Sequence, residues 1–303
     1  MDRREFLKNA ALTASALSLV KYSNLFAFQN ISPNNKYDLV AIKGGEPDLM
    51  FDKAIESLGG LKSYIKKGQK VVVKPNIGWD VLPEQAGNTN PLLVKRIIQH
   101  CYEAGAKEVY VFDNTCDNWK RCYANSGIEK AAKDAGGIVV SGNSEHYYHK
   151  VEVKKGKKLK GTKVHELILD SDVFINVPVL KHHGSTEVTI SMKNLMGCVW
   201  DRGYFHRNNL HQCIADMVSF RKPDLNIVDA YFVMKRNGPR GVSKNDVVLM
   251  KSQIISNDIV AADAAAAKLF GTEPMEIPHI KLAGDMKLGV GDLSKLNINR
   301  IIL

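Results

Sequence analysis

The segment Asn176–Asp216 carries the residues of this chain best suited to bind or react with a small molecule. Its cationic and titratable side chains are Lys181, His182, His183, Lys193, His206, Arg207 and His211. They stand among apolar stretches typical of strands and helices, where a buried charge or imidazole needs a partner. A small anion or a metal ion would provide one. The segment therefore predicts a site that prefers negative charge, but it identifies neither the substrate nor a cofactor.

Two classes of function are consistent with these residues. The catalytic hypothesis assigns proton transfer to His183 and His211, and anion binding to Lys74, Lys181 and Lys193, with Lys181 also counted as catalytic. It further requires a carboxylate, from Asp216 or Asp229, that orients one of the histidines. In the alternative, a binding or maturation protein holds an anion or a metal without turnover.

Other polar residues have a structural as well as a functional explanation. Lys193 and Asn194 lie near a predicted helix C-terminus, where they could satisfy free carbonyls ahead of Gly197. Asp263 lies inside an alanine-rich helix and is expected to seek a Lys or His, because a carboxylate contributes little to packing there. A metal site would draw on His206, His211 and His182 or His183, with Asp201, Asp216 or Asp229 as a fourth ligand.

Polar residues also follow the predicted strands at the point where each strand ends. These residues are Lys74 and Asn76, Asp113, Asn176 with Lys181, and Asp229. Taken singly, such residues commonly cap turns. In open α/β sheets, however, ligands bind beyond the carboxyl ends of the strands. We therefore expect these side chains to meet at one edge of the sheet.

Short β-branched runs alternate with helical patterns along the chain. Strands are predicted at 38–43, 70–73, 108–112, 173–177, 225–228, 247–255 and 298–303, and helices at 49–58, 91–104, 128–135, 186–195, 210–220 and 259–270. This alternation predicts a layered α/β fold with a mainly parallel sheet flanked by helices. Residues 37–303 contain no evident linker, which favours a single domain over two lobes.

Several motifs resemble the domain of unknown function 362 family. They are Lys74-Pro75-Asn76, Asn176-Val177-Pro178 with Lys181-His182-His183, Met192-Lys193-Asn194-Leu195-Met196-Gly197, His211 with Ile214 and Asp216, Val228-Asp229, Asn237-Gly238-Pro239 with Gly241, and Asp258 with Asp263 before Leu269-Phe270-Gly271. Many members have Lys-x-His after the strand, so His183 occupies the matching place. A ferredoxin-type module that members often carry is missing here. The resemblance implies a fold and a shared pocket, without a reaction.

The first 27 residues resemble a twin-arginine export signal. Arg3 and Arg4 precede the apolar run Ala10–Val20, Lys21 follows, and a small-residue cleavage point lies near Ala27. The run is too short to span a bilayer as a helix. We therefore expect residues 28–36 to be a linker, and the mature chain to be periplasmic or extracellular. The first 100 residues contain no cysteine for a lipid anchor, so no stable membrane anchor is expected.

The net charge of +10 is concentrated locally, because Lys150–Lys163 contains seven lysines and one glutamate. This run predicts a solvated hairpin. It lacks the arginines and interleaved aromatics of a nucleic-acid groove, so nucleic acid is not an expected partner.

The five cysteines contain no Cys-x-x-Cys pair, which argues against an iron–sulfur centre held by this chain alone. Cys116 and Cys122 could form a local disulfide. Cys198 lies beside the basic segment and is the cysteine of most functional interest.

Overall fold

The computed structural model describes residues 36–303, so the predicted export signal and nearly all of the predicted linker lie outside the described residues. Among residues 36–303, no helix is long and apolar enough to cross a membrane.

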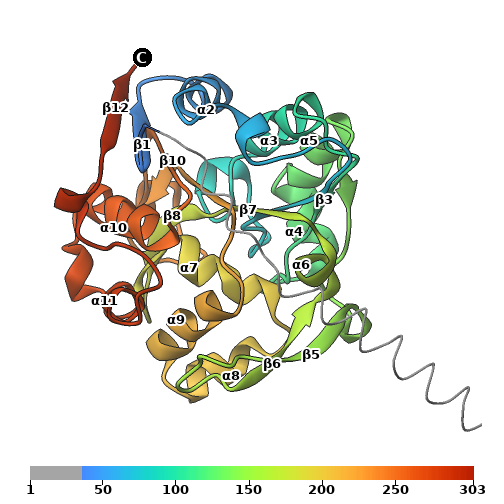
Figure 1. Ribbon diagram of the computed structural model, residues 1–303, viewed down its shortest axis with the longest axis vertical. Coiled ribbons are helices and arrows are strands. Elements are labelled where there is room, and N and C mark those ends of the chain that lie inside the picture. The colour runs from blue at the N-terminus through green and yellow to red at the C-terminus, as the bar shows by residue number, and fades with distance from the viewer. Residues whose placement is uncertain (1–35) are drawn as a thin grey trace, which may run out of the picture. The chain divides into compact units, whose positions relative to one another are not determined.

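The described strands form a central sheet and a separate hairpin (Figure 1). They are β1 (Leu39–Lys43), β2 (Lys70–Pro75), β3 (Glu108–Val111), β4 (Ile138–Val139), β5 (Tyr148–Glu152), β6 (Gly161–His165), β7 (Val173–Val177), β8 (Val179–His183), β9 (Glu187–Thr189), β10 (Leu225–Met234), β11 (Val247–Ser256) and β12 (Ile298–Ile302). The central sheet has the order β12-β1-β11-β10-β7-β2-β3-β4, and β8 joins it through β10 and pairs with β9.

Most neighbouring strands of the central sheet are parallel. The run from β10 through β7, β2 and β3 to β4 is parallel throughout, whereas β11 is antiparallel to both β1 and β10. The predicted α/β fold with a mainly parallel sheet is confirmed. The lysine-rich run also forms the expected hairpin, because β5 and β6 pair antiparallel.

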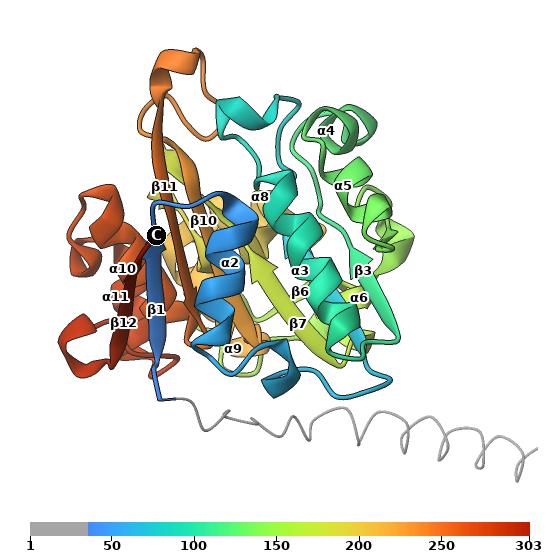
Figure 2. The same cartoon turned by 90° about the horizontal axis from the view of Figure 1, so that it is seen from above.

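Helices cover both faces of the sheet. They are α2 (Pro47–Glu56), α3 (Pro91–Glu103), α4 (Trp119–Asn125), α5 (Ile128–Asp134), α6 (Glu166–Asp170), α7 (Ser191–Asn194), α8 (Arg202–Arg207), α9 (Leu210–Phe220), α10 (Ile259–Phe270) and α11 (Pro278–Asp285). Val71 and Val73 of β2 pack with the core of α2, α3 and α5, while Val72 faces the core of α7, α9, α10 and α11. This alternation follows from the two-residue period of a strand. Figure 2 shows the sheet between α2 and α10.

The predicted helix over residues 186–195 is wrong in its first half. Residues Glu187–Thr189 form β9, which pairs antiparallel with β8, a strand that was not predicted. The β-branched Val188 and Thr189 suit a strand, and helix α7 begins only at Ser191. It begins there because the carboxylate of Asp263 accepts the backbone N–H groups of Ser191 and Met192, at 2.7 and 3.0 Å.

Candidate functional site

A buried ion pair lies where β2 and β3 end. Lys74 of β2 and Asp113, which follows β3, are almost completely buried, and Lys74 Nζ lies 2.7 Å from Asp113 Oδ1. The backbone of Gly197 approaches this pair so closely that a Cβ there would lie 1.9 Å from Asp113 Oδ1. Only glycine therefore fits at this position.

Three asparagines connect the ion pair to the neighbouring elements. Asn194 Oδ1 accepts hydrogen bonds from Lys74 Nζ at 3.2 Å and from Asn76 Nδ2 at 3.0 Å. Asn194 Nδ2 donates to Asn176 Oδ1 of β7 at 2.9 Å. Because β2 and β7 are in register at Lys74 and Asn176, this network fixes α7 against the carboxyl ends of both strands.

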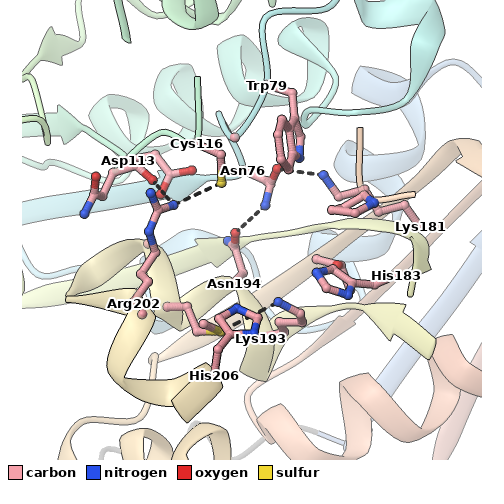
Figure 3. Close-up of a pocket in the computed structure, with 17 residues that line it drawn as sticks. Asn76, Trp79, Asp113, Cys116, Lys181, His183, Lys193, Asn194, Arg202 and His206 are labelled. Carbon is pink, nitrogen blue, oxygen red and sulfur yellow. Dashed lines mark hydrogen bonds between the residues drawn. The ribbon is translucent and has the colours of Figure 1, made fainter. Parts of the chain in front are cut away.

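A cavity of about 310 Å³ opens above this network (Figure 3). Its lining residues are Asn76, Gly78, Trp79, Asp113, Asn114, Cys116, Lys181, His183, Thr189, Lys193, Asn194, Met196, Gly197, Arg202, Gly203, His206 and Pro239. Figure 3 shows Lys181 and His183 on one side and Arg202 on the other. Asp113 is the acidic residue of this lining, and Lys74 already pairs with it. The remaining charged groups are cationic or titratable nitrogens.

Lys181 of β8 is a buried lysine whose hydrogen-bond partners are carbonyl oxygens. Its Nζ donates to the backbone oxygen of Gly87 and, at 3.2 Å, to Asn76 Oδ1. Within residues 36–303, no carboxylate forms an ion pair with it. Burial is the main reason why the pKa of Lys181 is lowered to about 7. Cys116 and Asp113 act to raise this pKa, whereas the charges of Lys193 and Lys74 act to lower it.

Two other lining residues have hydrogen-bonding capacity to spare. Lys193 of α7 is 9% exposed, and within residues 36–303 its Nζ forms only a weak hydrogen bond, 3.7 Å from Met196 Sδ. Burial lowers its pKa to about 8. Thr189 is 4% exposed and its hydroxyl has no hydrogen-bond partner among the described residues. A ligand could supply the hydrogen-bond partners that this buried hydroxyl and this buried ammonium lack.

The histidines of the cavity are neutral near pH 7. Burial, together with the nearby charges of Lys193 and Lys181, lowers the pKa of His183 to about 3. Burial and Lys193 also lower the pKa of His206. A neutral imidazole has one donor and one acceptor. Because His183 Nδ1 already accepts the backbone N–H of Ser185 at 3.0 Å, His183 offers a ligand the N–H of Nε2.

Arg202 and Cys116 form the outer side of the cavity. The guanidinium of Arg202 donates to the backbone oxygens of Asn114 and Thr115 at 2.8 and 2.6 Å, and to Cys116 Sγ at 3.2 Å. Cys116 is exposed and unpaired, whereas Cys122 is buried in α4. The disulfide that the sequence allows between them does not form. Cys198 is not available for chemistry, because its burial raises its pKa to about 12.

Some of the candidate site residues line the cavity and others support it. Asn76, Asp113, Lys181, His183, Lys193 and Asn194 line it. Lys74 and Asn176 belong to the hydrogen-bonded layer beneath them, and Asp263 holds the start of α7 through two backbone N–H groups. Burial raises the pKa of Asp263 to about 7.

Asp229 and His211 lie outside the cavity lining. Asp229 accepts the backbone N–H groups of Asn90 and Tyr231 at 2.7 and 3.0 Å, and burial raises its pKa to about 6. His211 of α9 contacts His279 of α11, with 3.1 Å between their Nδ1 atoms. Asp229 is therefore bound to backbone groups and His211 to another histidine, so the two residues do not face a shared ligand.

The predicted histidine–carboxylate pair does not form. Asp216 accepts the backbone N–H groups of Lys158 and Leu159 and the side chain of Gln212, and Asp229 is also bound to backbone groups. The proposed metal ligands are not brought together either. In the part of the chain that the structure describes, no three His, Cys, Asp or Glu residues are grouped so that they could hold a metal ion.

Sequence reasoning missed Trp79, Thr189 and Arg202 as lining residues and considered Cys116 only for a disulfide. Cys116 has a usable signal, because it follows Asp113 closely after the end of β3. Arg202 and Thr189 line the cavity only because α8 and β9 fold back over the sheet, and the sequence carries no local signal for this.

Comparison with known proteins agrees with the motifs. Residues 71–268 match the family described as "Domain of unknown function (DUF362)". The chain belongs to this family. The thylakoid-associated protein sll1697 of Synechocystis sp. is 26% identical to this DUF362 chain over 245 residues, which cover 78% of the chain and 73% of that protein.

A solved structure also shows similarity to this DUF362 protein. The lactate racemase apoprotein from Thermoanaerobacterium thermosaccharolyticum matches 86% of the chain, with 12% sequence identity and a TM-score of 0.44. The chain spans 58% of the length of that protein.

Proposed function

We propose that this DUF362 protein binds a small anionic molecule, a carboxylate or phosphate, in the cavity beneath Arg202. The observation that carries the proposal is the charge of the lining. Lys181, Lys193 and Arg202 face the cavity, while its one lining carboxylate, Asp113, is already paired with Lys74. Like charges in a buried site repel one another, and an anion would relieve this repulsion.

The unused hydrogen-bonding groups support the same proposal. Lys193 Nζ lacks an oxygen or nitrogen acceptor among the described residues, and Thr189 Oγ1 lacks any partner there. An anion with several oxygens could accept from both groups. The cavity, at about 310 Å³, is at the small end of the range usual for ligand pockets, which favours a compact ligand.

Thermal unfolding with sulfate, phosphate or succinate at constant ionic strength tests the proposal. Saturable binding to the native state is expected to raise the free energy of unfolding by about 2.7 kcal/mol at a ligand concentration of 100 times Kd. Lys193→Met should abolish the rise. Lys107→Met, which removes an exposed lysine, is the matched control and should retain it. Equal responses of both variants would place the anion elsewhere and refute the proposal.

A catalytic function is the second candidate, and the pKa of Lys181 favours it. A lysine with a pKa of about 7 exchanges protons readily at neutral pH. His183 lines the cavity, is neutral at that pH and could relay a proton. His211 cannot take this role, because it lies outside the cavity lining. Deuterium incorporation from solvent into a bound carboxylic acid, followed by NMR, would separate an enzyme from a binding protein.

We further propose that the protein is exported by the twin-arginine machinery, with residues 1–27 as the signal, 28–36 as a linker and 37–303 as the mature domain. The adjacent arginines and the short apolar run support this division. Changing Arg3 and Arg4 together to lysine should keep the precursor in the cytoplasm, because the route recognises the guanidinium pair. Normal export of a reporter fused after Ala27 in that variant would refute the proposal.

A further inference from the structure

Two buried lysines of the site differ in one respect. Lys74 and Lys181 are 0% and 1% exposed, so each has lost nearly all contact with water. Lys74 has a carboxylate partner, Asp113, at 2.7 Å. Among residues 36–303, the partners of Lys181 are the carbonyl oxygens of Gly87 and Asn76. A carboxylate stabilises an ammonium, whereas burial without one favours the neutral amine.

A neutral amine is a nucleophile, which an ammonium is not. Desolvation and a second cation nearby are the means by which proteins produce such lysines. Lys181 has both, because it is buried and Lys193 lies close enough to lower its pKa. It also lines the cavity rather than the core, so a ligand can reach it.

We propose that Lys181 forms a Schiff base with the carbonyl group of a 2-oxo acid. The inference rests on the proposed function and specifies its ligand, because a 2-oxo acid carries a carboxylate next to the reacting carbonyl. Lys193 and Arg202 line the same cavity and would hold that carboxylate. Thr189 and the neutral imidazole of His183 are available to the carbonyl oxygen.

The covalent step needs no further reactant. The lone pair of Lys181 Nζ attacks the carbonyl carbon, and an N–C bond forms as the C=O π bond breaks. The nitrogen, now positively charged, loses one proton and the oxygen gains one, which gives a neutral carbinolamine. The resulting carbinolamine takes a second proton and loses water as the C–O bond breaks. The product is an iminium ion, and water regenerates the amine and the oxo acid in the reverse reaction.

Reductive trapping of the full-length native protein tests the inference. Pyruvate or 2-oxoglutarate is added with sodium cyanoborohydride, which delivers hydride to the iminium carbon and makes the bond permanent. Peptide mass spectrometry should find the reduced adduct on Lys181, at a yield at least about tenfold above exposed lysines at equal times. Butanone, a neutral ketone, should give much less adduct. Propionate, a carboxylate without a ketone group, should protect Lys181.

The pH profile and two variants provide independent measurements. The trapping rate should rise with pH through a midpoint of about 7, the pKa of the Lys181 amine. Lys181→Met should lose the adduct, and Lys193→Met should keep Lys181 reactive only at higher oxo-acid concentration. A midpoint near the ordinary lysine value of 10.5 would overturn the inference.

The outcomes separate this inference from the anion-binding proposal. Oxo acids that raise the melting temperature of the wild-type protein but leave no adduct on Lys181 overturn the covalent step alone. An adduct confined to Lys193 or to exposed lysines also overturns it. Oxo acids and sulfate that neither bind nor react overturn both proposals.

Discussion

Replacing Lys181 with methionine should stabilise the ligand-free protein below neutral pH. The folded structure lowers the pKa of Lys181 from 10.5 to about 7. Below pH 7 the folded protein therefore holds a buried charge, at a cost of about 5 kcal/mol relative to the unfolded chain. Methionine retains most of the apolar stem and removes this cost. It also removes two hydrogen bonds, to Gly87 and Asn76, which together are worth about 3 kcal/mol.

The effect depends on pH in a defined direction. Lysine in the unfolded chain stays protonated until about pH 10.5, whereas Lys181 in the folded protein loses its proton near pH 7. The stability of the wild-type protein that is linked to this group therefore rises between these two values. At pH 9 the remaining cost is only about 2 kcal/mol. Lys181→Met is thus expected to stabilise by about 2 kcal/mol at pH 6 and to destabilise by about 1 kcal/mol at pH 9.

Urea denaturation of both proteins at pH 6 and pH 9, in chloride without other anions, measures this difference. The effect of the substitution on the free energy of unfolding is expected to differ by about 3 kcal/mol between the two pH values. This difference does not depend on how much the lost hydrogen bonds contribute. A difference in unfolding free energy that is the same at both pH values would refute the reasoning. It would mean that Lys181 remains an ammonium in the folded protein.

Other substitutions and reagents probe the same site. Lys74→Met should destabilise by about 3–5 kcal/mol, the opposite sign to Lys181→Met, because it leaves the carboxylate of Asp113 buried without its partner; urea denaturation at pH 7 measures it. Gly197→Ala should destabilise by about 3 kcal/mol or more, since its Cβ would lie 1.9 Å from Asp113 Oδ1; a small loss would show that the backbone moves easily. Iodoacetamide should alkylate Cys116 first, because the other four cysteines are buried, and sulfate should slow the reaction. Peptide mapping that finds another cysteine labelled equally fast would contradict the described burial.

The helices that the sequence predicted well have strong local signals. The predicted helix over residues 259–270 is confirmed, because Asp258 accepts the N–H groups of Val260 and Ala261 at its start, and Gly271 adopts a positive φ at its end. These signals act within one turn of helix. The edge of the sheet at which Lys74, Asn76 and Lys181 meet was also foreseeable, because parallel strands bring their carboxyl ends together.

Contacts between segments far apart in the sequence could not be predicted from such local signals. The helix predicted over residues 186–195 fails at Glu187–Thr189, because these residues pair with β8. The two β-branched residues there, Val188 and Thr189, are too weak a local signal to reveal that pairing. His211 looked like a proton-transfer residue, yet α9 directs it to His279. Helix direction of this kind follows from the packing of α9 against α11, which local sequence does not encode.

The amino-acid sequence by itself determined the α/β alternation, the family and the concentration of cations at the ends of the strands, because periodicity and residue type are local properties. Only the tertiary structure decided the charge state of each cation. Lys74 and Lys181 are the same residue type at comparable positions, but one meets Asp113 and the other meets carbonyl oxygens. The energy of a buried charge depends on its partners and on the loss of water around it, and both arise only when segments far apart in the chain come together.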